Sequence, residues 1–186
     1  GDSLQGTPLV QYYLAHADEF PHHPVAEAFN AMGCDYFTLG NHDFNFGYDA
    51  LRAYLCAMDG VCLCANVQDL GGALPLLPET VHTLKNGLRI GIVGGVTQDL
   101  ASLVSPSGLT GITVKPLVPA VNSVIADLKD GNPANGEADV IIVTVHEGAP
   151  VGTQTMAQNV AASPAFADIV NNLDPRAQVV INGHTH

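Results

Sequence analysis

The chain has 186 residues, of which 47% are hydrophobic and 13% are charged. This composition predicts one folded domain and excludes an intrinsically disordered chain. The formal net charge of −12 excludes a surface built to bind nucleic-acid backbones or anionic membranes, because no basic stripe offsets the acidic residues.

The first third of the chain predicts two helix–strand pairs. Residues 24–32 carry apolar side chains at helical spacing, Gly33 suits the left-handed position at a helix end, and residues 36–39 form a short apolar run. A second helix is expected over residues 48–58 and a second strand over residues 61–65. The alternation of helix and strand favours a layered fold.

The middle of the chain predicts a β-hairpin. Two strand-like runs, residues 80–85 and 88–93, flank the dipeptide Asn86-Gly87, which is typical of a two-residue turn. At least part of the sheet is therefore expected to be antiparallel. The segment Gly91–Gly95 is interpreted as a strand that leaves the sheet, in preference to a nucleotide-binding loop.

The last third predicts two more helix–strand pairs. Helices are expected around residues 121–128 and 163–173, and strands over residues 139–146 and 178–181. Together with the hairpin, these elements predict an α/β fold in which layered mixed sheets are flanked by helices.

Three of the predicted strands run directly into polar residues. One is followed by Gly40-Asn41-His42-Asp43, the next ends at His146, and the last runs into Asn182-Gly183-His184-Thr185-His186. Open α/β sheets place their binding sites at the carboxyl ends of strands. The sequence therefore predicts one site at that edge.

The side chains at these strand ends suit a site with two metal ions. His184 and His186 can direct imidazoles toward neighbouring metals, and His146 adds a third from another strand. Asn41 offers an amide oxygen, and Asp2 offers a carboxylate able to bridge. Taken singly, Asp2 fits a turn and His146 fits a buried histidine with satisfied hydrogen bonds; the combination favours the metal site.

The other histidines lack such a context. We expect them on the surface or in loops; they are His16, His22, His23 and His82. Glu147, next to His146, is expected to be a solvated loop residue.

The motifs resemble those of the calcineurin-like metallophosphoesterase superfamily. The resemblance rests on four motifs in chain order: Gly1-Asp2, Gly40-Asn41-His42-Asp43, His146 and Gly183-His184-Thr185-His186. Residues 1–9 and 41–47 are similar to the nucleotidase branch, which includes 5′-nucleotidases and 2′,3′-cyclic-nucleotide 2′-phosphodiesterase/3′-nucleotidases. The match spans nearly the whole chain.

The resemblance implies a role for each matching residue. Asp2 would bridge two divalent metal ions. Asn41, His146 and His184 would complete the second metal site, and His186 would bind the first metal. The same resemblance implies that a further residue, His42, is not a ligand but contacts the phosphoryl group or protonates the leaving oxygen. Manganese, zinc, iron and cobalt all suit this mixture of nitrogen and oxygen ligands.

Two parts of the family pattern have no match here. Family members begin with an Asp-x-His motif that supplies the first metal with ligands, and their nucleotidases carry a C-terminal nucleotide-binding domain. Residues 1–186 are therefore expected to be an incomplete catalytic domain, truncated at both ends. Such a chain is expected to hold at most one metal ion firmly, on the side of Asn41, His146 and His184.

Position 45 bears on the choice of branch. In 5′-nucleotidases an aspartate typically pairs with the catalytic histidine at this position, whereas Asn45 is similar to the cyclic phosphodiesterase branch. His23-Pro24-Val25 points the same way. We expect Asn45 to support the site from beside the ligands. Because Asn45 is neutral, we expect Asp43, the remaining nearby carboxylate, to orient His42.

The resemblance thus implies a dinuclear-metal hydrolase of nucleotide phosphate esters, with 2′,3′-cyclic-nucleotide 2′-phosphodiesterase/3′-nucleotidase activity as the first hypothesis. Asn41 and His42 would contact the substrate, a small nucleotide rather than a nucleic-acid polymer. A 5′-nucleotidase or nucleotide-sugar hydrolase is the alternative. An inactive fragment that keeps the fold and acts only as a binding module is the alternative of another class.

The cysteines follow neither zinc-site nor disulfide spacing and are expected to be unpaired thiols; they are Cys34, Cys56, Cys62 and Cys64. Unpaired thiols favour a cytoplasmic location, with export to the periplasm or cell surface as the alternative. No apolar run approaches the roughly 20 residues of a membrane-spanning helix, and no signal-peptide pattern is present at the start.

Overall fold

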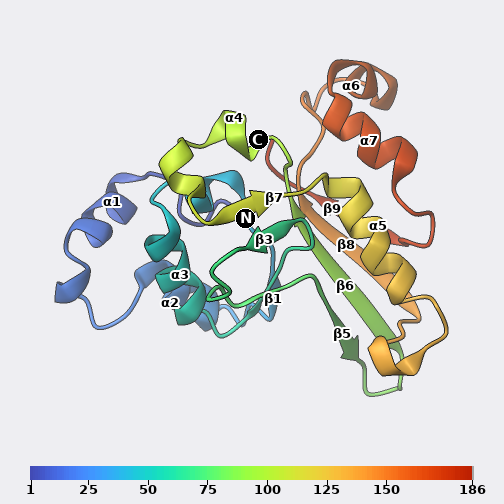
Figure 1. The fold of residues 1–186 in the computed structure, drawn as a ribbon, viewed down its shortest axis with the longest axis horizontal. Helices are drawn as coiled ribbons and strands as arrows, with labels where there is room; N and C mark the ends of the chain where they lie inside the picture. Colours follow the sequence, from blue (N-terminus) through green and yellow to red (C-terminus); the bar gives the residue numbers. More distant parts are fainter. Residues whose placement is uncertain (186) are drawn as a thin grey trace.

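In the computed structural model, which describes residues 1–185, three β-sheets are flanked by helices (Figure 1). The strands are β1 (Tyr36–Phe37), β2 (Val61–Leu63), β3 (Val67–Asp69), β4 (Leu76–Leu77), β5 (Glu79–Thr83), β6 (Arg89–Val96), β7 (Ile112–Val114), β8 (Val140–His146) and β9 (Val179–Asn182). The α-helices are α1 (Pro8–Ala15), α2 (Pro24–Ala31), α3 (Tyr48–Ala57), α4 (Leu100–Leu103), α5 (Leu117–Asp127), α6 (Met156–Ala162) and α7 (Pro164–Asn172). The 3₁₀ turns are η1 (Ala17–Glu19), η2 (Asn41–Phe44), η3 (Pro106–Leu109) and η4 (Pro133–Asn135).

The sheets are mixed, as the sequence predicts. The largest has the order β5-β6-β8-β9, with β5 antiparallel to β6 and the other pairs parallel. A second sheet, β1-β2-β4, is parallel, and β3 pairs antiparallel with β7. The carboxyl ends of β6, β8 and β9 therefore lie along one edge of the largest sheet.

Two separate apolar cores hold the layers together. In the first, α2 and α3 pack on the β1-β2-β4 sheet, with Leu51 and Tyr54 among its buried residues. In the second, α5 and α7 cover the β6–β8 region, with Val121, Ile125 and Val143 fully buried. Burying each such side chain contributes about 1.5–3 kcal/mol. Figure 1 shows the two helical groups on opposite sides of the long strands β6 and β8.

Strand β6 lies inside the largest sheet, between β5 and β8, so the interpretation of Gly91–Gly95 as a strand leaving the sheet is wrong. Its glycines allow close contact with the second sheet. A Cβ atom on Gly94 would collide with the carbonyl oxygen of Leu63, and the Gly94 carbonyl accepts a hydrogen bond from the N–H of Ala65 at 2.9 Å. This glycine is where the two larger sheets meet.

The hairpin forms as predicted, but its loop has three residues rather than two. The N–H of Leu84 donates to the carbonyl of Leu88, and the N–H of Gly87 donates to the carbonyl of Leu84, both at 2.8 Å. Gly87 alone takes a positive φ, of 88°. This is a turn followed by a left-handed glycine, the usual three-residue hairpin loop, because Asn86 does not adopt the left-handed conformation that a two-residue turn requires.

His23 is not the surface residue that the sequence suggests. It is 5% exposed, and its Nδ1 accepts a hydrogen bond from the N–H of Ala26 at the start of α2. Its ring packs between those of Tyr13 and Tyr54, with centroid distances of 4.6 and 5.3 Å. The ring therefore belongs to the packing around α2.

Candidate metal centre

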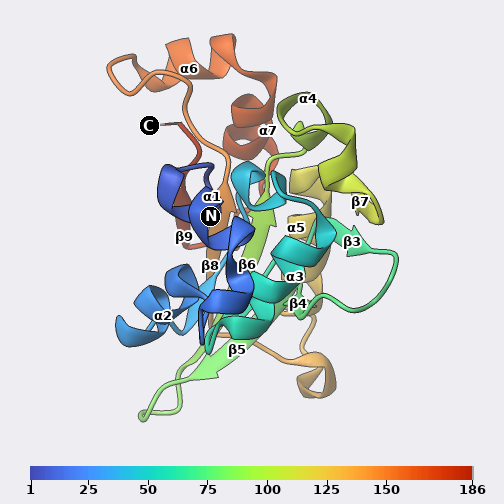
Figure 2. The same ribbon diagram turned by 90° about the vertical axis from the view of Figure 1, so that its left-hand side faces the viewer.

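The ends of β8 and β9 bring two of the predicted ligands together. His146 is the last residue of β8, and β9 ends at Asn182. The parallel register pairs Val145 with Asn182, so His146 lies beside the Gly183-His184 segment that follows β9. The ring centroids of His146 and His184 are 5.0 Å apart. Figure 2 shows β8 and β9 running side by side.

Asp2 and Asn41 reach the same point from the other side. Asp2, His146 and His184 each present a ligand atom within 4.8 Å of the others. Asp2 Oδ2 lies 2.9 Å from His146 Nε2, and Asn41 Oδ1 lies 3.2 Å from the same nitrogen. The expected convergence of these four residues is therefore present, whereas His186 lies outside the described residues.

The donor set fits a divalent metal ion. A carboxylate oxygen, an amide oxygen and imidazole nitrogens suit borderline ions such as manganese, zinc, iron or cobalt. The Nδ1 atom of His184 is buried and finds no hydrogen-bond partner among residues 1–185. A buried polar atom without a partner is costly unless another group occupies its lone pair, and a metal would do so.

Backbone strain coincides with this cluster. Among the described non-glycine residues, only Asp2 and His184 have positive φ angles, of 66° and 78°. Left-handed conformations of such residues are sparsely populated and concentrate at functional sites. Gly40 makes the Asp2 conformation possible, because any Cβ at that position would collide with the Asp2 carboxylate. The chain therefore holds both side chains in place against a local cost.

The hydrogen bonds around Asp2 favour its charged form. Burial alone would raise the pKa of the carboxyl group, but hydrogen bonds from the His146 ring and the His42 backbone N–H oppose it and leave the pKa below its usual value. Asp2 is thus a carboxylate at neutral pH. An ionised carboxylate is the form that binds metals.

The expectation that Asp43 orients His42 is wrong. The Nδ1 atom of His42 lies 2.8 Å from the side-chain amide nitrogen of Asn45. Asp43 instead uses its carboxylate for backbone N–H groups, those of Asp2, Leu4 and Gly40. The side chain of Asp43 therefore points away from His42, and the neutral Asn45 takes the position at its ring.

Glu147 is also placed differently from the expectation. It is 6% exposed rather than solvated. Its side chain accepts the N–H of Gly148 at 3.1 Å, and its carbonyl accepts the side-chain amide of Asn182 at 3.0 Å. Glu147 therefore helps tie the end of β8 to the end of β9. Its position directly after a predicted ligand is the only signal for this in the sequence.

The cysteines are all free, as expected. Cys62 and Cys64 are buried in β2 and directly after it, and burial raises the pKa of Cys64 to about 12. A thiol with so high a pKa is neither a nucleophile nor a ready metal ligand at neutral pH. Within residues 1–185, no helix combines the length and the apolar character required to cross a bilayer.

The sequence matches the family description "Calcineurin-like phosphoesterase" over residues 1–186. The chain belongs to this family. Its members hydrolyse phosphoric esters with the help of divalent metal ions, in agreement with the enzyme class that the motifs predict.

Relatives carry related functional names. The chain is 29% identical over 199 residues to the trifunctional nucleotide phosphoesterase protein YfkN of Bacillus subtilis, covering all of this chain and 13% of that protein. It is 28% identical over 198 residues to a 2′,3′-cyclic-nucleotide 2′-phosphodiesterase/3′-nucleotidase of Salmonella typhimurium, covering all of this chain and 29% of that protein. The chain therefore spans less than a third of the length of either relative.

Solved structures share the fold. The crystal structure of the calcineurin-like phosphoesterase YfkN from Bacillus subtilis superimposes with a TM-score of 0.72 at 25% identity, over 99% of this chain and 56% of that one. A 5′-nucleotidase precursor from Thermus thermophilus gives a TM-score of 0.67 at 21% identity, over 97% of this chain and 30% of that one. The layered α/β architecture is thus that of metallophosphoesterases.

Proposed function

We propose that this chain carries the catalytic centre of a metal-dependent nucleotide phosphoesterase, with 2′,3′-cyclic nucleotides and 3′-nucleotides as its substrates. The observation that carries the proposal is the meeting of Asp2, His146 and His184 beside Asn41 and His42. Ligand-type side chains from separate segments converge there next to a histidine that is free to act on a substrate.

The chain's own residues would divide the chemistry between binding and proton transfer. Asp2, Asn41, His146 and His184 would hold a divalent metal. When bound, such a metal activates water and neutralises charge on the phosphoryl oxygens. His42 would stand at the reacting group without being a ligand.

His42 is held in a form that can donate a hydrogen bond to a substrate. An amide N–H from Asn45 to Nδ1 leaves the proton of the neutral ring on Nε2. The backbone N–H of His42 donates to Asp2 Oδ1 at 2.9 Å, which fixes the residue relative to the metal ligands. His42 Nε2–H would then donate a hydrogen bond to the phosphoryl oxygens, and the doubly protonated ring would be the form that protonates the departing ribose oxygen.

Two observations favour the cyclic phosphodiesterase activity over 5′-nucleotidase activity. A relative that matches the whole chain carries the cyclic-nucleotide name. In addition, the partner of His42 is the neutral Asn45, where the resemblance leads one to expect an aspartate in 5′-nucleotidases. The alternative, 5′-nucleotidase activity, is supported by the solved structure of a 5′-nucleotidase precursor with the same fold.

Phosphate release from three nucleotides tests the proposal. A protein that carries residues 1–186 together with the expected Asp-x-His motif and C-terminal nucleotide-binding domain is supplied with Mn²⁺ and incubated with 2′,3′-cyclic AMP, 3′-AMP or 5′-AMP, with His42→Ala as the inactive control. We expect turnover of the first two substrates to exceed that of 5′-AMP. Faster hydrolysis of 5′-AMP would replace the proposal with the 5′-nucleotidase alternative. Bound Mn²⁺ with no hydrolysis of any substrate would leave only a binding module.

A further inference from the structure

The carboxylate of Asp43 lies at the centre of a backbone cradle next to the metal centre. Its Oδ2 accepts the N–H of Gly40 at 2.8 Å and the N–H of Asp2 at 3.1 Å, and its Oδ1 accepts the N–H of Leu4 at 2.9 Å. The residue is 1% exposed. Asp43 thereby fastens the first residues of the chain to the turn that carries Asn41 and His42.

This cradle explains how a strained residue is held in place. Asp2 has a φ of 66°, and its side chain must reach His146 and His184 from a short segment that belongs to none of the three sheets. Asp43 binds the N–H of Asp2 itself and the N–H two residues later, on either side of the strained turn. Anchors on both sides leave the carboxylate of Asp2 little freedom to turn away.

We propose that Asp43 is a positioning residue for the metal centre: it holds Asp2 and Asn41 at the spacing that a metal ion requires, and it does not act on His42 or on the substrate. This inference rests on the metal site of the proposed function. Partners of metal ligands that fix the ligand geometry typically change metal affinity about 10- to 100-fold when they are removed.

Asp43→Asn is the variant that separates positioning from simple loss of fold. Asparagine has the same shape but one acceptor oxygen in place of two. Because the two carboxylate oxygens accept backbone N–H groups on opposite sides, one of them must face an amide NH₂ in the variant. At least one of the anchors on Asp2, Gly40 or Leu4 is therefore lost, without a cavity being created.

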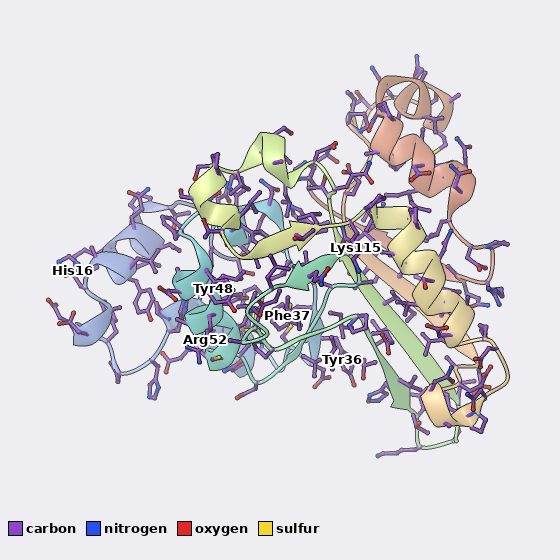
Figure 3. The ribbon with its side chains drawn as sticks, in the orientation of Figure 1. His16, Tyr36, Phe37, Tyr48, Arg52 and Lys115 are labelled. Carbon is purple, nitrogen blue, oxygen red and sulfur yellow. The ribbon has the colours of Figure 1, made fainter. Side chains whose placement is uncertain are left out.

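Asp69 offers a matched control. It too accepts three backbone N–H groups, those of Gly71, Ala73 and Leu74, and it also accepts the hydroxyl of Tyr48, which Figure 3 labels on α3. None of its hydrogen bonds involves a metal-centre residue. Asp69→Asn therefore removes a similar cradle and tests whether a general loss of stability accounts for any change in metal binding.

The test measures Mn²⁺ binding by calorimetry and backbone amide exchange in metal-free protein for the wild type and both variants. We expect Asp43→Asn to bind Mn²⁺ about 10- to 100-fold more weakly and to lose amide protection at Gly40 or Leu4. We expect Asp69→Asn to lose protection at residues 71–74 while its Mn²⁺ affinity stays within twofold of the wild type.

Two results would overturn the inference. One is Mn²⁺ affinity in Asp43→Asn within twofold of the wild type; the other is an equal loss of affinity in both variants. Neither readout depends on catalysis. Mn²⁺ binding without ester hydrolysis in the longer protein of the substrate test would refute the proposed function and leave the role of Asp43 standing. Wild-type Mn²⁺ affinity in Asp43→Asn, with an active wild-type enzyme, would refute the role of Asp43 and leave the proposed function standing.

Discussion

At the scale of single residues, the histidines of the centre differ in what surrounds their nitrogens. His146 Nε2 lies within 3.2 Å of both Asp2 and Asn41, among ligand-type oxygens. Among residues 1–185, His42 Nδ1 has a hydrogen-bond partner only in the side-chain amide of Asn45, and His42 reaches Asp2 through its backbone. The first pattern is that of a ligand, and the second is that of a group free to transfer a proton.

This difference predicts separate effects of two alanine substitutions. His42→Ala should lower turnover of 2′,3′-cyclic AMP by about 10²–10⁴-fold, the usual contribution of one positioned proton donor, with metal content unchanged. His146→Ala should lose metal and activity together. Elemental analysis of the dialysed proteins beside the rate assay distinguishes the two cases. Equal metal loss in both variants would make His42 a ligand.

Asn45 should act only through His42. Its amide makes one neutral hydrogen bond, worth about 0.5–1.5 kcal/mol, so Asn45→Ala should lower turnover by up to about tenfold without changing Mn²⁺ affinity. Asn45→Asp keeps a partner at Nδ1 and serves as the conservative variant. It should restore more of the rate than alanine does and shift the pH profile, because a carboxylate favours the protonated ring. Identical pH profiles for the aspartate variant and the wild type would contradict direct contact with His42.

Part of the site could be predicted from the sequence, because some of its residues stand directly at the ends of apolar strands. His146 ends β8 and His184 follows β9, and the carboxyl ends of neighbouring parallel strands meet at one edge, so their convergence needs no tertiary detail. Asn41 follows β1 in another sheet, so its place beside His146 depends on how the two sheets pack. The contacts of Asp43 could not be found in this way. They depend on where the segment carrying Asp2 and Leu4 folds back against the turn, 39 to 41 residues away in sequence.

At the scale of elements, the amphipathic segments are the predictable ones. α2 and α3 begin where predicted and end within one residue of the predicted bounds, because their apolar spacing and terminal glycines are local signals. Helix α6 and the short strands β3 and β7 went unpredicted. The capping-box pattern Thr155-x-x-Gln158 stands in the sequence, but α6 has only seven residues and so little apolar periodicity; β3 is three residues long.

The close approach of β6 to the second sheet gives a prediction about stability. Gly94→Ala should destabilise the fold by about 1–3 kcal/mol or more, because the added methyl group collides with the Leu63 carbonyl and neither strand can move freely. Gly152→Ala is the control, since a methyl group there meets no atom within 4 Å and should change stability by about 0.5 kcal/mol or less. Urea unfolding of both variants measures the difference. Equal midpoints would show that the sheets are not held together at Gly94.

The pair Arg89–Asp139 ties the start of β6 to the start of β8 and predicts a pH effect. The Arg89 guanidinium, 2.8 Å from the carboxylate, lowers the pKa of Asp139 to about 2. A carboxyl group whose pKa is lower in the folded state stabilises the fold above its unfolded value near 3.8, and that contribution is lost as pH falls toward 2. Both side chains are more than a third exposed, so the effect should be small and should shrink at high salt. Between pH 4 and 2 the unfolding midpoint of Asp139→Asn should therefore change less with pH than that of the wild type. An equal pH dependence in both proteins would show that this ion pair does not contribute to stability.

At the scale of the whole molecule, the metal centre lies where two independently packed halves meet. Asp2 and Asn41 are continuous with the core formed by α2 and α3, whereas His146 and His184 follow strands of the core formed by α5 and α7. Contacts between β6 and the second sheet also link these halves. A metal ion at the centre would therefore join both halves through direct bonds.

This arrangement predicts that metal binding stabilises the whole fold and not just a loop. Free Mn²⁺ at about 100 times its dissociation constant should add about 2.7 kcal/mol, which raises the unfolding temperature of a domain of this size by roughly 5–10 °C. EDTA should reverse the shift. His146→Ala should unfold at one temperature with or without Mn²⁺, while His16→Ala, a half-buried histidine labelled in Figure 3, should keep the wild-type response. Because each core contributes ligands to the same metal ion, circular dichroism and intrinsic tyrosine fluorescence should report the same shift in unfolding temperature. A shift seen by only one probe, or one that survives in His146→Ala, would mean that the metal does not join the two halves.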